Sequence, residues 1–256
     1  SGIKTSFFDV EQLDEIELAI NEKTKIVFLE SVGNPNLRLP NLVELIAIAN
    51  KKGIAVIVDN TTTPISIQPL KLGADIIVYS TTKSITGNAS ALGGAVIFRA
   101  IKENDKFKNT KRYPFLEPII KKMGKTALIA NGKKRAMRDF GMSANAIASY
   151  LTILGLDTLA IRLERVTKTV EKVAFHLYSM GVPVRHPSLP NHEHLDLYRG
   201  LFKKGCGPLL TFDFGTKEKA FAFLDNSKLI TITANIGDNR TLGLHMASTI
   251  YSDFTK

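Results

Sequence analysis

The chain has 256 residues, of which 44% are hydrophobic and 23% are charged. This length and composition allow a large buried core and exclude a chain that is disordered throughout. Its single cysteine, Cys206, excludes an internal disulfide framework, and we expect a packed structural thiol there. The sequence offers neither a secretory segment nor an apolar stretch long enough to span a bilayer, which predicts a soluble, cytoplasmic protein without a membrane partner.

The net charge of +10 raises nucleic acid as a partner, because clustered Lys and Arg attract phosphate groups. The basic clusters span Lys102–Arg112, Lys121–Arg138 and Lys203–Lys204. None of them alternates with stacking aromatic residues or carries a recognised nucleic-acid-binding motif. We therefore expect solvated loops and helix faces, and a nucleic-acid-binding protein remains only as an alternative.

The first half of the chain alternates amphipathic windows with short apolar runs, a pattern that predicts an α/β fold with a mostly parallel sheet covered by helices. We predict helices at Val10–Asn21 and Asn41–Lys52, and strands at Lys25–Leu29, Ile54–Val58, Ile76–Tyr79 and Gly94–Phe98. The basic stretch Asp105–Met123 contains two prolines, which predicts an irregular excursion over the surface.

The second half begins with a predicted helix at Ala144–Ile153. After Gly155 a longer helix is predicted over Asp157–Met180, with Asp157 as its N-cap. We place a domain boundary near Leu156, which gives a large domain over 1–156 and a smaller α/β domain over 157–256. In the smaller domain we predict strands within Gly207–Phe214 and Leu229–Ala234 and a helix at Lys217–Leu224.

Two of the predicted strands end in opposite charges: one leads to Asp59 and the next leads to Lys83. The carboxyl ends of neighbouring strands in an open α/β sheet border the crevice where ligands bind. Two hydroxyls, Ser80 and Thr82, lie at alternate positions before the lysine. An amine, a carboxylate and hydroxyls suit pyridoxal phosphate, which carries an aldehyde, a pyridine ring and a phosphate. Taken singly, each charge is more often explained by a solvated strand end or a helix cap.

Three segments of the sequence resemble the Cys/Met-metabolism family of pyridoxal-phosphate enzymes. The first runs from Val58-Asp59-Asn60-Thr61 through Gly73–Lys83 to Gly93-Gly94, the second covers Phe28–Leu37, and the third covers Ala234–Asp238 and His245–Thr249. The family contains cystathionine γ-synthase, the cystathionine lyases, methionine γ-lyase and O-acetylhomoserine sulfhydrylase. The resemblance implies the aspartate-aminotransferase-like fold (fold type I), with a mostly parallel large domain and a smaller α/β C-terminal domain.

The resemblance also implies roles for individual residues. Lys83 would bond the cofactor aldehyde and move protons on the substrate, and Asp59 would pair with the pyridine nitrogen. Ser80 and Thr82 would bind the cofactor phosphate. Asn34 would contact the cofactor ring oxygen or the substrate carboxylate, although Asn-Pro is also a common start of a turn.

Two further positions carry over from the family: Thr61, which would bind the cofactor, and Asn235, which would help to hold the substrate carboxylate through its backbone and side chain. Glu30 would mainly support the site. The segment Ala234–Asp238 is most similar to the sulfhydrylase version of the motif. The predicted reaction is therefore γ-replacement on O-acetylhomoserine by sulfide or methanethiol, with methionine γ-lyase and cystathionine γ-synthase or γ-lyase activity as alternatives. The family also implies a homo-oligomer, a dimer of dimers with shared active sites.

His192 and His194 lack a third ligand at a zinc-site spacing, so we expect solvated loop residues and no metal. The chain departs from the family in lacking its N-terminal phosphate loop and stacking Tyr and its C-terminal substrate-binding Arg. We therefore expect both domains to be incomplete: the sequence is either a truncated chain or, as we favour, the ordered part of a longer, cofactor-free chain. The missing segments also keep open an inactive structural paralogue.

Overall fold

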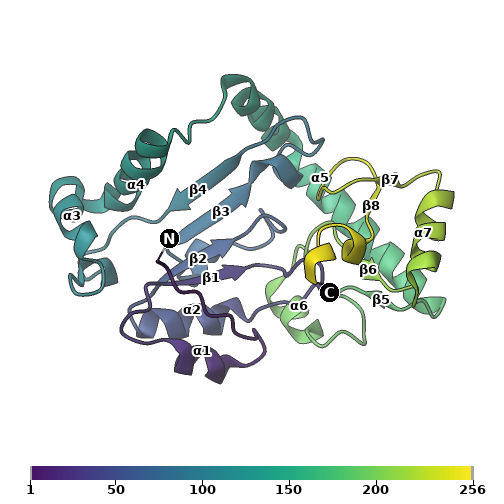
Figure 1. Ribbon diagram of the computed structural model, residues 1–256, viewed down its shortest axis with the longest axis horizontal. Coiled ribbons are helices and arrows are strands. Elements are labelled where there is room, and N and C mark those ends of the chain that lie inside the picture. Colours follow the sequence, from purple (N-terminus) through teal and green to yellow (C-terminus); the bar gives the residue numbers. More distant parts are fainter. Residues whose placement is uncertain (1, 255–256) are drawn as a thin grey trace.

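The computed structural model describes residues 2–254 and contains a central sheet of four strands. The strands are β1 (Ile26–Glu30), β2 (Ala55–Asp59), β3 (Ile76–Ser80) and β4 (Gly94–Phe98). They lie in the order β1-β2-β3-β4, in which β1, β2 and β3 are parallel and β4 is antiparallel to β3 (Figure 1). The predicted α/β fold with a mostly parallel sheet is confirmed, and each predicted strand lies within one residue of the observed one.

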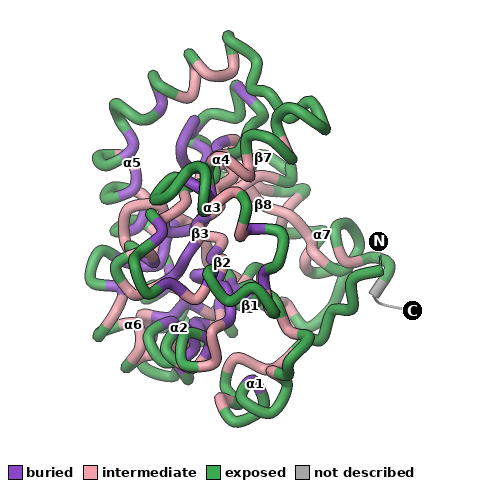
Figure 2. The backbone as a smooth tube through the Cα atoms, turned by 90° about the vertical axis from the view of Figure 1, so that its left-hand side faces the viewer, coloured by how far each residue is buried: buried purple, intermediate pink, exposed green. Residues whose placement is uncertain are grey.

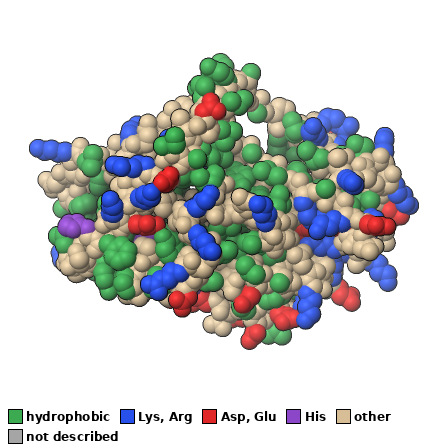
Figure 3. Space-filling model, turned by 180° about the vertical axis from the view of Figure 1, so that it is seen from behind, with side chains coloured by type: hydrophobic (Ala, Val, Ile, Leu, Met, Phe, Trp, Pro, Cys, Tyr) green, Lys and Arg blue, Asp and Glu red, His purple; other side chains and the backbone are tan. Residues whose placement is uncertain are grey.

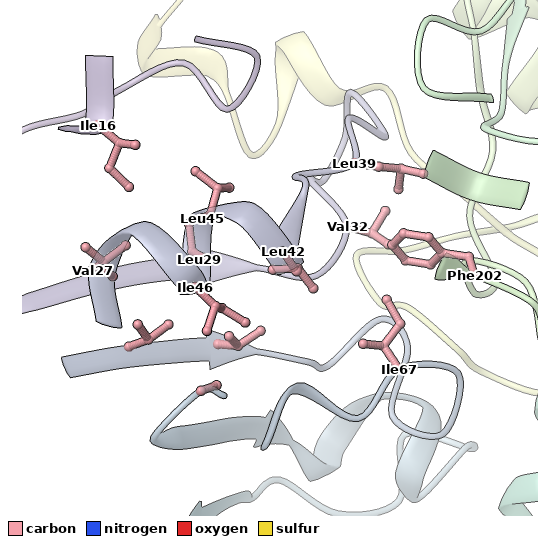
Figure 4. Close-up of a cluster of buried hydrophobic side chains, with 14 of the residues drawn as sticks. Ile16, Val27, Leu29, Val32, Leu39, Leu42, Leu45, Ile46, Ile67 and Phe202 are labelled. Carbon is pink, nitrogen blue, oxygen red and sulfur yellow. The ribbon is translucent and has the colours of Figure 1, made fainter. Parts of the chain in front are cut away.

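Helices α1 (Leu13–Ala19) and α2 (Leu42–Lys51) lie together beside β1 and β2 (Figure 1). The Asn41 side chain caps α2 by accepting a hydrogen bond from the Glu44 backbone, at 3.3 Å, as expected for a helix that begins after an Asn. Leu42, Leu45 and Ile46 turn inward from α2 and are fully buried against the sheet (Figure 4). Each such side chain stabilises the fold by roughly 1.5–3 kcal/mol.

Beyond β4 the chain forms α3 (Glu117–Met123) and α4 (Ala127–Gly132). The prediction of irregular structure throughout Asp105–Met123 is therefore wrong at its C-terminal end. Pro118 lies in the first turn of α3, where a missing backbone N–H leaves no helical hydrogen bond unmade, so this proline starts the helix instead of breaking it.

A helix of 34 residues, α5 (Ala146–Ser179), runs from the sheet to the C-terminal part of the chain (Figure 1). The Asn145 side chain caps it by accepting hydrogen bonds from the backbone N–H groups of Ile147 and Ala148, so the predicted break after Gly155 and the predicted N-cap at Asp157 are both wrong. Gly155 is needed for close packing: a Cβ there would lie 2.3 Å from the carbonyl oxygen of Ile85. The predicted domain boundary at Leu156 falls inside this continuous helix.

By length and composition alone, α5 could cross a bilayer, and 17% of its most apolar window is buried in the protein. The expectation that no segment reaches this length was therefore wrong. Its polar residues Asp157 and Arg162 separate short apolar runs that look brief in the sequence but join into one helix. A single helix that passes this test is weak evidence for a membrane.

After α5, the strands of the described residues are short and form two small sheets, and two α-helices lie between them in the chain. They are β5 (Val184–Arg185), α6 (Leu195–Leu201), β6 (Thr211–Phe212), α7 (Lys217–Asn226), β7 (Thr231–Ile232) and β8 (Leu242–Gly243). Strand β5 pairs with β6 antiparallel, and β7 pairs with β8 in parallel. The predicted strands here are present but shorter, because few side chains cover them; burial is concentrated around β1, β2 and β3 (Figure 2).

The charge of the chain is distributed, as expected, over solvated surfaces. On the face in Figure 3, Lys and Arg side chains are scattered among Asp, Glu and apolar groups instead of forming one basic stripe. Many are paired, as in the helical ion pairs Lys121–Glu117 and Lys168–Glu164. A distribution of this kind favours solubility over the continuous phosphate contact of a nucleic-acid interface.

Candidate active site

The carboxyl ends of β1, β2 and β3 meet at one edge of the sheet. Glu30 and Asp59 are register partners at the ends of β1 and β2. Just beyond β2, the Thr61 backbone N–H donates to the Asp59 carboxylate at 2.9 Å, and the Thr61 hydroxyl oxygen accepts from the Ser80 backbone at 2.8 Å. Three of the predicted site residues, Asp59, Thr61 and Ser80, are thus joined by direct hydrogen bonds.

Strand β3 leads directly into a π-type turn over Thr81–Ile85 that carries Lys83. Lys83 itself has a non-helical backbone (φ −83°, ψ −134°) that interrupts the turn. The Thr82 hydroxyl accepts a hydrogen bond from the Gly93 backbone at 3.0 Å, which ties the turn to the start of β4. The Lys83 side chain is half-buried, and its Nζ donates to Asn235 Oδ1 at 3.1 Å.

Glu30 and Asn34 follow β1 at the same edge. Desolvation by the surrounding protein and the negative charge of Asp59 raise the pKa of Glu30, and a hydrogen bond from the Asn34 backbone partly offsets them. Asn34 is exposed, and its carbonyl oxygen accepts from the Tyr251 hydroxyl at 3.1 Å. The structure therefore brings a segment near the end of the described chain to the end of β1.

The structure thus joins the predicted residues in three groups. Asp59, Thr61 and Ser80 form one group, Lys83 contacts Asn235, and Asn34 contacts Glu30. Within residues 2–254 no ion pair or hydrogen bond links Asp59 directly to Lys83. An amine, a carboxylate and hydroxyls at one sheet edge form a donor set that fits the aldehyde, pyridine and phosphate of pyridoxal phosphate.

Arg162 on α5 supports the lysine turn, a role that the sequence analysis missed. Its guanidinium donates to the carbonyl oxygens of Ser84 at 2.7 Å, Ile85 at 3.0 Å and Gly155 at 2.7 Å. A cavity of about 250 Å³ lies beside it, between α5 and the residues after the turn. The sequence could have indicated this role, because Arg162 lies between the apolar residues Leu159 and Leu163, and a charged residue on the apolar face of a helix needs polar partners.

The histidines contradict the prediction of solvated loop residues, because His192 and His194 are both buried. Together with Glu193 they place three possible metal-ligand atoms within 4.8 Å of one another. The His192 Nδ1 atom accepts from the His194 backbone at 3.1 Å, and the His194 Nδ1 atom accepts from the Leu39 backbone at 2.8 Å. Both Nδ1 lone pairs are thereby occupied, and the His194 Nε2 atom lies 3.2 Å from the Glu11 carboxylate, as expected for a ring that carries its proton on Nε2.

Cys206 is buried, as predicted for a structural thiol. Burial is the main cause that raises the pKa of its thiol to about 12. A thiol of this kind stays protonated near neutral pH and is a poor nucleophile.

Comparison with known proteins gives relatives along the whole chain. The family model for Cys/Met metabolism PLP-dependent enzymes matches residues 1–256. O-acetyl-L-homoserine sulfhydrylase 1 of Thermus thermophilus is 36% identical over 99% of this chain and 63% of its own length. A homocysteine/cysteine synthase of Kluyveromyces lactis is 32% identical over 99% of this chain and 62% of its own. The chain thus spans less than two thirds of the length of these relatives.

Solved structures give the same family. An O-acetylhomoserine (thiol)-lyase of Campylobacter jejuni, which carries N'-pyridoxyl-lysine-5'-monophosphate, aligns with a TM-score of 0.88 at 33% identity, covering 96% of this chain and 62% of its own. An O-acetylhomoserine sulfhydrylase of Wolinella succinogenes aligns with a TM-score of 0.82 at 35% identity, covering 94% of this chain and 67% of its own. The match over every residue of the chain and the shared fold, fold type I, lead to one conclusion: this chain belongs to the Cys/Met metabolism family of PLP-dependent enzymes.

Proposed function

We propose that the protein containing this chain is an O-acetylhomoserine sulfhydrylase that uses pyridoxal phosphate. In the overall reaction the Cγ–O bond of O-acetylhomoserine breaks, acetate leaves, and sulfide or methanethiol forms a Cγ–S bond. The product is homocysteine or methionine. The observation that carries the proposal is the hydrogen bond from Lys83 to Asn235, because it joins the strand-end lysine to the segment most similar to sulfhydrylases.

Four groups at the sheet edge would hold the cofactor. Asp59 would accept a hydrogen bond from the pyridine nitrogen and keep it protonated, and the Ser80 and Thr82 hydroxyls would bind the phosphate. Thr61 supports this arrangement by linking the residues after β2 to Ser80. When bound, pyridoxal phosphate supplies an electron-withdrawing ring that stabilises negative charge on substrate carbons.

Lys83 has two tasks in this proposal. Its Nζ would bond the cofactor aldehyde before substrate arrives, and afterwards the free amine would take the proton from the substrate Cα and move protons at Cβ. Proton transfer by one well-placed amine contributes on the order of 10²- to 10⁴-fold in rate. The half-buried position of Lys83 at the end of β3 suits both tasks.

Asn34 and Asn235 would bind the substrate carboxylate. Asn34 is exposed in the turn that follows β1, where a ligand could reach it. The side chain of Asn235 already contacts Lys83 and Asp238, so we assign its contribution to the backbone N–H.

A direct test follows cofactor binding and turnover in the same samples. Wild-type protein mixed with pyridoxal phosphate should develop the visible absorbance band of a lysine-bound cofactor, and Lys83→Ala should abolish it. Lys133→Ala, which removes an exposed lysine after α4, is the matched control and should keep the band. If the wild type develops no band, or if Lys83→Ala keeps it, the assignment of Lys83 is wrong.

The reaction itself is tested with O-acetylhomoserine and sulfide, scored for homocysteine against α-ketobutyrate. Homocysteine as the main product supports γ-replacement. Formation of α-ketobutyrate, with or without sulfide, would instead identify a γ-eliminating lyase.

We further propose that the protein is a cytoplasmic homo-oligomer, a dimer of dimers in which active sites are shared. Each chain would have a large domain over 1–156 and a smaller one over 157–256. The exposed apolar side chains on the first half of α5 support an assembly that covers them: Ile147 is 70% exposed, Tyr150 61% and Ile153 58%. Sedimentation equilibrium of the purified protein should give the mass of a tetramer. A monomer at micromolar concentration would refute the assembly.

A further inference from the structure

The turn from Asn235 to Arg240 lies directly on the lysine turn. Gly237, which has a φ of +71°, approaches Ser84 so closely that a Cβ would lie 2.0 Å from the Ser84 hydroxyl and 2.8 Å from its backbone nitrogen. Only glycine tolerates both the left-handed backbone and the contact. The two turns therefore pack as one unit, although they are far apart in the sequence.

Asn235 bridges an amine and a carboxylate across this contact. Its Oδ1 accepts from Lys83 Nζ at 3.1 Å, and its Nδ2 donates to Asp238 Oδ2 at 3.4 Å. An ionised carboxylate can only accept, so the Asn235 nitrogen must face Asp238. The amide between them consequently has one allowed orientation, in which its oxygen faces Lys83 and its nitrogen faces Asp238.

Arg240 keeps Asp238 ionised and fixed. The Asp238 side chain has 0% exposure, and the guanidinium binds it in a bidentate manner, with Nε to Oδ1 and Nη2 to Oδ2 both at 2.9 Å. The backbone N–H of Arg240 also donates to Oδ1 at 2.9 Å. The hydrogen bonds from Arg240 outweigh burial and lower the pKa of Asp238. A bidentate pair of this kind adds geometric specificity as well as energy.

We propose that Asp238 and Arg240 are positioning residues for Lys83, which they orient through the side chain of Asn235; the inference rests on the proposed role of Lys83. The pair holds the Asn235 amide so that it presents an acceptor to the Lys83 amine whenever that amine is free. The free amine is the form that receives the cofactor and that moves substrate protons. The pair thus sets the rate of the chemical step and leaves substrate affinity nearly unchanged.

The test measures the reactivity of Lys83 as well as turnover. Cofactor-free protein is mixed with pyridoxal phosphate, the adduct is trapped with borohydride at successive times, and the label at Lys83 is counted by peptide mass spectrometry. In Asp238→Asn we expect labelling at Lys83 and kcat to fall by about 10- to 100-fold, the effect of misplacing a reacting group by about 1 Å. The KM for O-acetylhomoserine should stay within about two-fold, because uniform binding is not affected.

Three further variants complete the test. Arg240→Gln removes a side chain that is 55% exposed, so folding is retained, and labelling should slow in the same direction. Arg240→Lys keeps the positive charge and should recover part of the rate. Asp225→Asn removes an exposed carboxylate at the end of α7 and should behave as wild type.

Wild-type labelling rates in both Asp238→Asn and Arg240→Gln would overturn the inference, as would a change confined to KM. A third outcome separates the two claims: the wild type is labelled at Lys83 but makes neither homocysteine nor methionine, and the variants are labelled slowly. This outcome would support the inference and overturn the proposed reaction. A wild type that acquires no label at Lys83 would overturn both.

Discussion

Gly155 gives the sharpest stability prediction, because two effects of opposite sign meet there. Gly155→Ala improves the helix propensity of α5, which favours the variant by about 1 kcal/mol. The new methyl group, however, would lie 2.3 Å from the Ile85 carbonyl oxygen and 2.7 Å from the Thr86 Cα, and both are backbone atoms. These atoms cannot turn away as a side chain can, so the helix and the lysine turn must separate.

The size of that separation decides which effect wins. Ordinary contact with a Cβ begins at 3.4 Å, so α5 must move by about 1 Å from Ile85. The movement loosens the small core where Ile85 packs against Leu159 and Leu163. Overpacking costs about 1–3 kcal/mol, and because these contacts are with backbone atoms we take the upper part of that range, about 2–3 kcal/mol, which exceeds the gain in propensity by about 1–2 kcal/mol. We expect Gly155→Ala to lower the free energy of unfolding by about 1–2 kcal/mol.

Urea unfolding followed by circular dichroism measures this difference. Gly200→Ala in α6 is the matched control, because a Cβ there meets nothing within 4 Å, and it should raise stability by up to about 1 kcal/mol. A Gly155→Ala protein that is as stable as the wild type, or more stable, would refute the packing argument and show that helix propensity dominates at this position.

Three further predictions concern buried polar groups. The Tyr113 hydroxyl accepts from the Ala55 backbone at 2.8 Å and donates to the Lys25 carbonyl oxygen at 2.9 Å. Tyr113→Phe should remove both hydrogen bonds, leave the Ala55 N–H only its longer bond to Lys25 at 3.3 Å, and cost about 1–3 kcal/mol in urea unfolding. Burial raises the pKa of Asp105, but its hydrogen bonds, above all from Arg99, outweigh burial and lower it. The folded state therefore binds a proton on Asp105 less tightly than the unfolded state does, and the stability that the ionised carboxylate contributes is lost as pH falls below the ordinary Asp pKa of about 4. Asp105→Asn should remove this part of the fall in the free energy of unfolding at acid pH, measured as a function of pH. Burial lowers the pKa of His186 from 6.5 to about 4. The contribution of the neutral His186 ring to the free energy of unfolding is complete above pH 6.5 and declines toward pH 4 at about 1.4 kcal/mol per pH unit. In His186→Gln this pH dependence should be absent, and an unchanged slope of the free energy of unfolding against pH would contradict the prediction.

The central sheet could be predicted from the sequence because its strands are short apolar runs that alternate with helical windows. The run Ala55–Asp59 is apolar up to its final carboxylate, so both the strand and the residue at its end were visible. The same logic located Lys83, because the turn that carries it begins directly after β3. Resemblance then supplied the family, which the comparisons confirm.

What failed depended on contacts between distant segments. We predicted a helix end at Gly155 because glycine is a poor helix former. Glycine is needed there for close contact with Ile85, about 70 residues earlier in the chain, and local propensity cannot reveal such a contact. His194 is buried where its ring accepts a hydrogen bond from the Leu39 backbone, 155 positions earlier, and only the folded chain brings these two residues together. Asp238 was visible in its motif, but its link to Lys83 through Asn235 required the two turns to be seen together.

The contact between Lys83 and Asn235 also has a consequence for the order of events during synthesis. The two residues are separated by 152 positions in the chain. At about 5–20 residues per second, a ribosome needs roughly 8–30 s to make the stretch between them, which is ample time for the N-terminal sheet to fold. Lys83 thus spends that interval on a formed strand end without its acceptor, and a nascent chain should acquire a correctly held lysine only after residue 235 has left the exit tunnel.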